Sequence, residues 1–360
     1  MSAHAPPPVI GGFPNGIVPG CLIVLAAFLP MRDAHAQCCT PIEGCEIKGP
    51  CDYPTNRNAA IPEPNTPMLT VQTVVHVLCT DEEFCWQTQQ EVDDFMCLVN
   101  EDYEPWRIQF DYTTQFHNDT AAWDPNNVNT DVKDVYAQSP ESTLNIYLTM
   151  VSPSGAVFPW SASALAVRGG VVLNSFADYG LNRRTPTHEI GHALGLYHVF
   201  WGAQLGCEHT CYEFVDMDAE DRDTVGDLCS DTMPLPAGHG GCAVSGTDCD
   251  DTPWTDDSVG NWMTFNDNES CLGEFTEQQA GRMHCWIASR LWGWVCYGDA
   301  DQDLDVDDDD YDRVLEDLNL EGDFLASDLN KDGVVDDDDL DIAAEEWGKD
   351  CTDGTTPCSS

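Results

Sequence analysis

Basic residues are scarce in this chain. Only 14 of its 360 residues are Lys or Arg, against 64 Asp or Glu, so the formal net charge is −50 at pH 7. Nucleic acids and anionic membrane surfaces carry dense negative charge and would repel such a chain. The composition therefore excludes sequence-independent binding to nucleic acid or to an anionic membrane, and it favours cations as ligands.

Long apolar runs are also missing. The run at residues 16–29 is shorter than the roughly 20 residues of a membrane-spanning helix, and Ala34-His35-Ala36 follows it. A short apolar run before such a small-x-small sequence is typical of a secretory signal peptide, although no Lys or Arg precedes the run. We expect residues 1–36 to be a signal peptide, and the protein to be secreted or attached to a cell surface, with no membrane span.

Cysteine, by contrast, is abundant. The chain has 18 cysteines, and few stand at the C-x-x-C spacing of structural zinc sites, which favours disulfides formed in an oxidising compartment. Loss of the signal peptide would remove Cys21 and leave an odd number, so at least one thiol would be unpaired or intermolecular. Hydrophobic residues make up 42% of the chain, which is enough for a sizeable core and two or three domains.

Three histidines and one glutamate between residues 188 and 198 have a spacing that suits a metal. His188 and His192 are four residues apart, so on a helix their imidazoles project from one face and can bind one zinc ion. Glu189 lies between them, where its carboxylate can take a proton from a water whose pKa the metal lowers. Gly195 can adopt positive φ and turn the chain, which brings His198 to the metal as third ligand. The spacing predicts a zinc protease site with Glu189 as general base.

An ordinary amphipathic core helix that carries histidines by chance is the alternative. A lone H-E-x-x-H occurs by chance in many helices, but here glycine and a third histidine follow at fixed places. That longer pattern is the metzincin signature, and it favours the metal site.

Hydrophobic periodicity predicts the elements around this motif. The β-branched run at residues 68–78 should be a strand, and a helix capped by Asp81 should close near Tyr103. Further strands are expected at 108–113, 144–150 and 170–174. This order indicates a mixed sheet with helices packed on it. His76 and His117 lie outside any metal-ligand spacing, and we expect both to be structural.

Two stretches lack this periodicity. Residues 37–66 are rich in cysteine and proline, and we interpret them as a linker or a short pro-segment. Cys51 could be a pro-segment thiol that blocks the zinc, but a disulfide is the favoured interpretation. Residues 201–262 are irregular and cysteine-rich, so disulfides and bound calcium are expected to order them.

Residues 68–294 resemble the pappalysin family of metzincins. Besides the zinc motif, the resemblance rests on Leu-Asn-Ile-Tyr-Leu (144–148), Gly-Val-Val-Leu-Asn (170–174), Val-Gly-Asp-Leu-Cys-Ser-Asp-Thr (225–232) and Phe-Thr-Glu-Gln-Gln-Ala-Gly-Arg-Met (275–283). It implies an α+β, metzincin-like catalytic domain, in which a mixed twisted sheet and an active-site helix precede an irregular subdomain stapled by disulfides.

The same resemblance implies pairings and ligands in that subdomain. Met263 would lie in a tight turn below the zinc ligands. The implied disulfides are Cys207–Cys249 and Cys242–Cys271, and the implied calcium ligands are Asp227, Asp231 and Thr232.

Two further positions bear on catalysis and specificity. Family members usually carry tyrosine two residues after the turn methionine, and Phe265 stands there instead, so the phenol is absent. Glu269 corresponds to an acidic residue that can face the pocket for the residue after the scissile bond, which would favour Arg or Lys there. A solvated loop carboxylate that selects nothing is the alternative.

Two copies of a twelve-residue calcium-loop pattern follow, 29 residues apart and each before a helical stretch. Side-chain oxygens at loop positions 1, 3, 5 and 12 and a carbonyl at position 7 suit calcium. The expected ligands are Asp299, Asp301, Asp303, Asp305 and Asp310 in the first loop, and Asp328, Asn330, Asp332, Val334 and Asp339 in the second. Position 6 is Gly333 in the second loop but Leu304 in the first, which should strain the turn and weaken binding.

Aspartate at position 12 makes this pair resemble a dockerin module, a small all-α calcium-binding domain, more than an ordinary EF-hand. A cohesin-like or cell-surface partner would follow from that resemblance. A disordered acidic tail is the alternative, although residues 299–350 carry 23 Asp or Glu against 3 Lys or Arg. Apolar residues at core-like spacing argue against it, namely Val306, Leu315, Leu318, Val335, Leu340 and Ile342.

The expected organisation is a signal peptide (1–36), a linker or pro-segment (37–66), a zinc protease domain (67–297), a dockerin-like module (298–348) and a tail (349–360) in which Cys351 and Cys358 could pair. The expected function is hydrolysis of protein or peptide substrates with one catalytic zinc and at least two calcium ions. A non-catalytic, calcium-dependent extracellular binding or scaffold protein that retains a zinc site is the alternative.

Overall fold

A computed structural model of the chain describes residues 49–85, 87–120, 130–149, 156–157, 170–174, 184–237, 241–265, 271, 273–322 and 324–351. These residues belong to one compact unit that begins at residue 39. The expected signal peptide, Glu269 and most of the tail lie outside the described residues.

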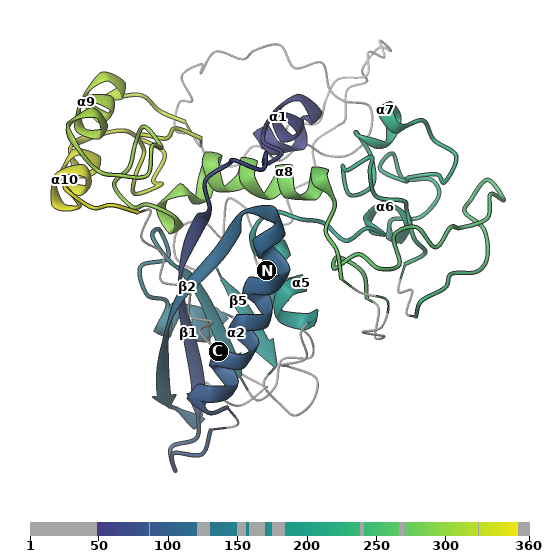
Figure 1. The fold of residues 1–360 in the computed structure, drawn as a ribbon, viewed down its shortest axis with the longest axis horizontal. Helices are drawn as coiled ribbons and strands as arrows, with labels where there is room; N and C mark the ends of the chain where they lie inside the picture. Colours follow the sequence, from purple (N-terminus) through teal and green to yellow (C-terminus); the bar gives the residue numbers. More distant parts are fainter. Residues whose placement is uncertain are drawn as a thin grey trace, which may run out of the picture. The chain divides into compact units, whose positions relative to one another are not determined.

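The first half of the described chain is built on a five-stranded sheet with the order β2-β1-β3-β5-β4 (Figure 1). The strands are β1 (Leu69–Cys79), β2 (Ile108–Asn118), β3 (Leu144–Thr149), β4 (Ala156–Val157) and β5 (Val171–Asn174). Neighbouring strands are parallel except β4, which pairs antiparallel with β5 at the edge. The mixed sheet predicted from the sequence is confirmed.

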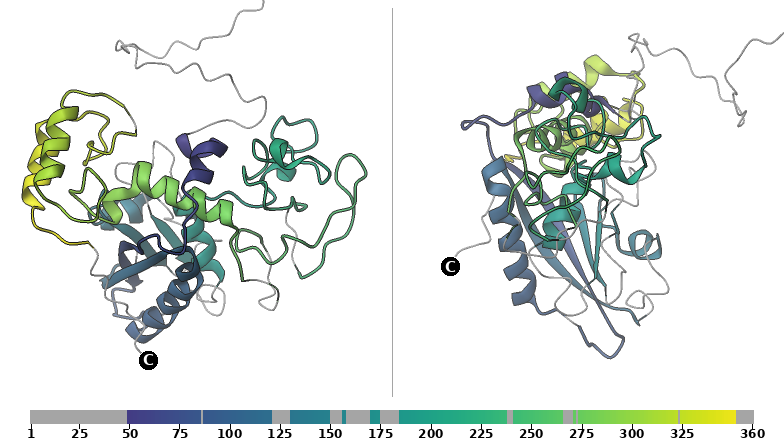
Figure 2. Two further views of the ribbon diagram at one scale, coloured as in Figure 1. Left: turned by 45° about the horizontal axis from the view of Figure 1, so that its top comes forward. Right: turned by 90° about the vertical axis from the view of Figure 1, so that its right-hand side faces the viewer.

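Successive side chains along each strand point to opposite faces of the sheet, and both faces are buried. Side chains of one face form the main core with the helix α2 (Gln89–Tyr103) and with α5 (Arg184–Ala193). Figure 2 shows the ribbon of α2 lying along the sheet. The residues in this layer include Val71, Val75, Val77, Val92, Phe95, Met96, Val99 and Ile190. The opposite face packs Leu78, Tyr147 and Val172 against Val132 of α4 (Thr130–Tyr136). Period-two burial on both faces is expected for a sheet covered by helices on each side.

The helix α2 begins later than the sequence predicted. Its N-cap is Thr88, whose hydroxyl accepts from the backbone N–H of Glu91 while the Glu91 carboxylate accepts from the N–H of Thr88. Asp81 instead exchanges hydrogen bonds with Thr120 at the end of β2. A disulfide between Cys79 and Cys85 closes this loop, so the chain cannot enter the helix at Asp81.

The remaining helices are short, and two of them lie in the irregular stretch predicted for residues 201–262. They are η1 (Pro50–Asp52), α1 (Pro54–Ala59), η2 (Glu104–Trp106), α6 (Trp201–Gln204), α7 (Ala219–Arg222), α8 (Glu277–Trp286), η7 (Ile287–Leu291), η8 (Trp292–Trp294), α9 (Asp308–Asp317) and α10 (Asp337–Glu345). Among the described residues, no helix is both long and apolar enough to cross a membrane.

Disulfides tie together segments that are distant in sequence. Two of them are the pairings implied by the resemblance, Cys207–Cys249 and Cys242–Cys271. Cys51 pairs with Cys285, so the favoured interpretation of Cys51 as a disulfide is confirmed and a free thiol at the zinc is wrong. Cys351 pairs with Cys296, so the suggested pairing with Cys358 is wrong. The N–H of Cys351 bonds to the carbonyl of Leu304, which holds residue 351 at the first acidic loop.

The acidic repeat forms two loop-helix units that share a small core. This core contains Ala300, Val314, Leu329, Val335 and Ala343. Each loop is paired with the segment after the other loop's helix, through an Asp305–Asp350 bridge and a Glu321–Val334 bridge. Leu315, predicted to be a core residue, is exposed, and its neighbour Val314 is buried instead. The residues that the structure describes here are therefore folded rather than a disordered tail.

The first acidic loop is also attached to the catalytic core. Leu304 packs into the main hydrophobic core, and the Trp292 indole donates a hydrogen bond to the Asp299 carboxylate at 3.1 Å. The Cys296–Cys351 disulfide lies at the same junction. The unexpected leucine at loop position 6 is thus explained, because its side chain anchors the loop in the core.

Candidate metal centre

A sharp turn after α5 brings the third histidine towards the first two. The N–H of Leu196 bonds to the carbonyl of Gly191, and the N–H of Gly195 bonds to that of His192, which closes the helix. Gly195 has φ +94°, and a Cβ at this position would overlap the indole of Trp286. Both facts require glycine here, as the sequence predicted for a chain reversal that leads to His198.

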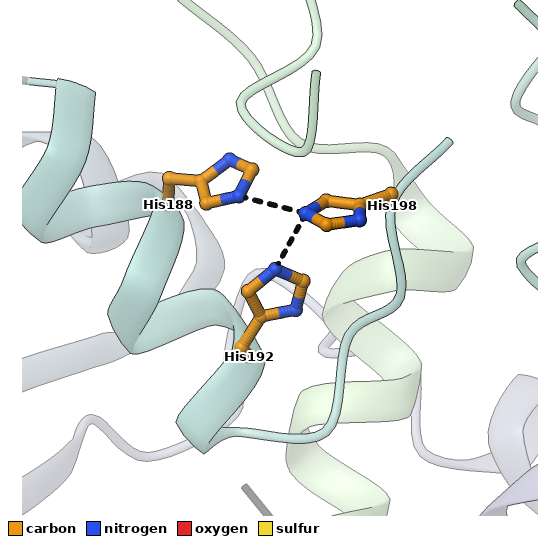
Figure 3. Close-up of side chains that lie close together, drawn as sticks. All are labelled: His188, His192 and His198. Atoms are coloured by element: carbon orange, nitrogen blue, oxygen red, sulfur yellow. Dashed lines mark hydrogen bonds between the residues drawn. The ribbon is translucent and has the colours of Figure 1, made fainter. Parts of the chain in front are cut away.

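The three imidazoles converge through their Nε2 atoms (Figure 3). The Nε2 atom of His198 lies 3.1 Å from that of His188 and 2.9 Å from that of His192. Two nitrogens bound at about 2.0–2.1 Å to a tetrahedral zinc ion are roughly 3.3 Å apart, which is close to this arrangement. The three nitrogens therefore have the spacing of one metal's ligands.

Backbone carbonyls fix the tautomers of two of these histidines. The Nδ1–H of His188 donates to the carbonyl of Trp262, and the Nδ1–H of His192 donates to the carbonyl of Leu196, both at 2.7 Å. A carbonyl can only accept, so Nδ1 carries the proton and Nε2 keeps its lone pair for a metal. Burial lowers the pKa of His188 to about 4 and that of His192 to about 3, and it also lowers the pKa of His198 well below its usual value. The site therefore presents neutral imidazoles, which fit zinc.

Glu189 is a buried carboxylate next to the first histidine. It is only 8% exposed, and burial raises its pKa to about 8. A carboxylate of this kind can exchange a proton with a water molecule at the site.

Contacts that the sequence analysis missed hold α5 in place. The hydroxyl of Thr187 donates to the Asp102 carboxylate at 2.8 Å, and the hydroxyl of Tyr103 donates to the carbonyl of Thr187 at 2.8 Å. Both partners stand at the end of α2, about 85 residues earlier in the chain. No local pattern around His188 signals these two residues.

Met263 packs against α5, and Phe265 packs against the ring of His198. Met263 is buried, and its carbonyl accepts from the N–H of Val199. A Cβ added to Gly191 of α5 would lie only 2.7 Å from the Met263 sulfur. The methionine therefore packs under α5, where the resemblance places it. Phe265 is 50% exposed, and its ring centroid is 4.6 Å from that of His198. The residue without a phenol thus stands beside the site.

The residues named as calcium ligands in the catalytic domain make different contacts. Asp227 and Thr232 are buried and bonded to each other. Asp231 instead caps α8, where its oxygens accept from Thr276 and from the backbone of Gln278. Glu213, which the sequence analysis did not single out, is buried, and neither of its carboxylate oxygens finds a hydrogen-bond donor among the described residues.

Glu213 and Asp227 repel one another. Burial, and then the charge of Asp227, raises the pKa of Glu213 well above its usual value, and burial raises the pKa of Asp227 to about 7. Two buried carboxylates of like charge, one of them without a donor, are the donor set that a calcium ion would satisfy.

The two acidic loops have the same internal geometry. In each loop, the backbone N–H groups of positions 2 and 3 donate to the carboxylate at position 12. That carboxylate is Asp310 in the first loop and Asp339 in the second. Position 6 has positive φ in both, +79° at Leu304 and +93° at Gly333. In the first loop, two clusters have the spacing of metal ligands, namely Asp299, Asp301 and Asp303, and Asp305, Asp307 and Asp310. Asp328, Asn330, Asp332 and Val334 occupy the corresponding places of the second loop.

His76 and His117, both expected to be structural, form a pair on adjacent strands. The Nδ1 atom of His76 is 2.9 Å from the Nε2 atom of His117. The Nε2 atom of His76 is 2.9 Å from the amide oxygen of Asn145. His76 is buried and its ring stacks on that of Tyr147. Burial lowers the pKa of His76 to about 4.

The proteins that are similar to this chain in sequence include metalloproteases. No protein-family model matches the chain. An extracellular metalloprotease of Pyricularia oryzae is 30% identical over 234 residues, covering 61% of this chain and 75% of that protein. Human pappalysin-1 is 36% identical over 180 residues, or 46% of this chain, but the chain spans only 10% of its length. A solved structure of a mutant promirolysin from Tannerella forsythia aligns with a TM-score of 0.47 at 16% identity, covering 66% of this chain and 86% of that chain.

Proposed function

Because the chain belongs to the family of extracellular metalloproteases, we propose that it is a secreted, zinc-dependent endopeptidase of pappalysin type. The observation that supports this proposal is the convergence of three neutral imidazoles beside the buried carboxylate of Glu189. His188, His192 and His198 would hold the zinc ion.

The chemistry divides between the metal and the protein. Bound zinc would lower the pKa of a water molecule and polarise the substrate carbonyl. Glu189 would take the proton from the attacking water and later give it to the leaving nitrogen of the peptide. Backbone carbonyls of Trp262 and Leu196 would keep the two helix histidines oriented throughout.

Calcium ions would support the fold around this site. We place two in the acidic loops and a further one near Glu213, Asp227 and Thr232. Buried carboxylates that lack donors are costly, and a divalent cation would offset that cost. The acidic loop pair would bind a cohesin-like or cell-surface partner outside the cell.

The substrate preference that we propose concerns the residue after the scissile bond. Glu269, which lies outside the described residues, would pair with an incoming Arg or Lys through charge-assisted hydrogen bonds. A peptide library read by mass spectrometry tests this, since enrichment of basic residues should disappear in Glu269→Gln. Enrichment of apolar residues after the cut would discard the preference and leave the peptidase proposal standing.

The decisive experiment compares Glu189→Ala with the wild-type protein. Glu189 is not a zinc ligand, so the variant should retain one zinc ion per chain and lose several orders of magnitude in kcat/KM on a peptide library. His192→Ala, which removes a ligand, should lose both zinc and activity and serves as the control. A wild-type protein that binds zinc but cleaves no peptide would instead favour the alternative, a calcium-dependent extracellular binding protein, for which the loss of the phenol at Phe265 is the supporting observation.

A further inference from the structure

A fully buried arginine on α8 contacts the turn that leads to the third histidine. The Nε–H of Arg282 donates to the carbonyl of Gly195 at 2.6 Å. Its guanidinium also lies over the ring of Tyr197, 4.8 Å from the centroid. Arg282 is 0% exposed, so these contacts are made in the protein interior and are not screened by solvent.

Four residues connect α5 to His198, and each makes a contact that holds it in place. The N–H of Leu194, the first of them, bonds to the carbonyl of Ile190. Gly195 is held through its carbonyl and Tyr197 through its ring, both by Arg282. Leu196 is held through its carbonyl, which accepts from His192. The position of His198 relative to the two helix histidines therefore depends on where the guanidinium of Arg282 is placed.

The position of Arg282 in turn depends on the segment that precedes the catalytic domain. Asp52 accepts from the guanidinium at 2.6 Å, and both side chains are fully buried. The carbonyl of Cys51 accepts a further bond from Arg282 at 3.1 Å, and the Cys51–Cys285 disulfide joins this segment to α8. The second oxygen of Asp52 accepts from the N–H of Gly49, which fixes the carboxylate.

We infer that Asp52 and Arg282 are positioning residues for the metal centre, which hold the Gly195 turn so that His198 reaches the zinc ion. The inference rests on the proposed zinc function. It also groups Cys51 and Asp52 of the N-terminal segment with the catalytic domain, because both contact Arg282. A guanidinium with a planar fork is suited to this role, because it binds a carboxylate and a carbonyl in fixed directions at once.

A neighbouring ion pair provides a matched control. Arg57 lies in the same N-terminal segment, is fully buried, and pairs with Asp223 at 2.7 Å while it also donates to the carbonyl of Leu228. It joins the segment to the core as the Asp52–Arg282 pair does, but neither Asp223 nor Leu228 belongs to the connection between α5 and His198. Breaking either pair removes a buried ion pair, so both changes should lower the thermal stability.

The test measures zinc affinity in Arg282→Lys, Asp52→Asn and Arg57→Lys by competition with a chromophoric chelator, at a temperature where circular dichroism shows each variant folded. We expect the first two variants to bind zinc at least tenfold more weakly than wild type, and Arg57→Lys to stay within twofold. The spectrum of bound cobalt should change in Arg282→Lys and Asp52→Asn only. Tyr197→Leu, a milder change in the same connection, should weaken zinc binding in the same direction and serves if a charge variant does not fold.

Equal zinc affinities in all variants would overturn the inference and leave a purely structural role for the pair. A wild-type protein that binds zinc without cleaving peptides would contradict the proposed function, yet the affinity comparison would still decide on Asp52 and Arg282. A wild-type protein that binds no zinc would contradict both.

Discussion

At the scale of single residues, the metal centre depends on where protons are held before any ion binds. The backbone carbonyls of Trp262 and Leu196 place the protons of His188 and His192 on Nδ1, and burial keeps the rings neutral. A metal therefore does not have to displace protons from these two ligands near neutral pH. Phe265, beside them, stands where the resemblance to the pappalysin family implies a tyrosine.

Restoring the phenol tests the importance of that departure. Phe265 is half exposed and packs against the ring of His198, so Phe265→Tyr should fold normally and keep zinc. If the hydroxyl reaches the developing oxyanion, kcat should rise by about tenfold or more, because one such hydrogen bond contributes up to roughly 10²–10³. Phe265→Leu, which has no hydroxyl, should show no increase. A tyrosine variant no faster than wild type would show that the family's phenol is not needed in this chain.

The buried His76 should make the fold sensitive to mild acid. Its pKa is about 4 in the folded state against 6.5 in the unfolded chain, so the unfolded state binds the proton first as pH falls. The stability that depends on this residue is therefore complete above pH 6.5 and is lost as pH falls from 6.5 to about 4. Urea unfolding should show that His76→Gln loses less stability across this range than wild type, by on the order of 2 kcal/mol. Parallel pH profiles would contradict the assignment.

At the scale of elements, the turn after α5 is where local and tertiary requirements coincide. Gly195 needs positive φ to end the helix, and it also needs an empty Cβ position because the indole of Trp286 lies there. The same turn receives the Arg282 hydrogen bond. The end of α5 and the Arg282 side chain of α8 thus meet at the peptide of Gly195. Arg282 also connects this peptide to Asp52 in the N-terminal segment.

Substitution at this turn should cost more than backbone strain alone. A non-glycine residue at positive φ costs roughly 1–2 kcal/mol. Gly206 is the control that isolates the cost of positive φ. It has φ +88°, and no atom lies within 4 Å of the position that a Cβ would take. Gly195→Ala should lower the free energy of unfolding by clearly more than Gly206→Ala and should also weaken zinc binding. Equal losses in chemical denaturation would mean that the indole moves aside without cost.

At the scale of the whole molecule, the acidic repeat and the catalytic core are joined by more than a linker. Leu304 belongs to the main core, Trp292 donates to Asp299, and a disulfide links Cys296 to Cys351. The first loop therefore packs against the catalytic core through Leu304. The second loop has Gly333 at the same position, as expected of an ordinary calcium loop. The domain boundary near residue 298 remains a prediction.

Removal of calcium should consequently affect both halves. The clustered carboxylates of residues 299–347 would repel one another without a cation, so this segment should lose structure first. The main thermal transition should also shift downwards, by roughly 2–4 °C for each kcal/mol of binding free energy lost. Calorimetry with and without a calcium-selective chelator measures this, with zinc content checked in parallel. A main transition that does not move would mean that the repeat is an independent module.

The sequence by itself determined the chemistry of the centre. His188, Glu189 and His192 follow from helical spacing, Gly195 and His198 follow from the need to turn, and the β-branched runs specify the strands of the sheet. These features are local, because helical and strand periods act over a few residues. The two repeated acidic loops were recognisable for the same reason.

Only the tertiary structure decided how distant residues support that centre. Arg282 reaches Gly195 across 87 positions and Asp52 across 230, and His76 meets His117 because β1 and β2 are neighbours in the sheet. The helix α2 starts at Gln89, after the N-cap Thr88, because a disulfide and the Asp81–Thr120 bonds occupy the preceding loop. Leu304 is unfavourable within its loop, and its place in the core explains it. Such contacts depend on strand order and helix packing, which no short pattern of residues encodes.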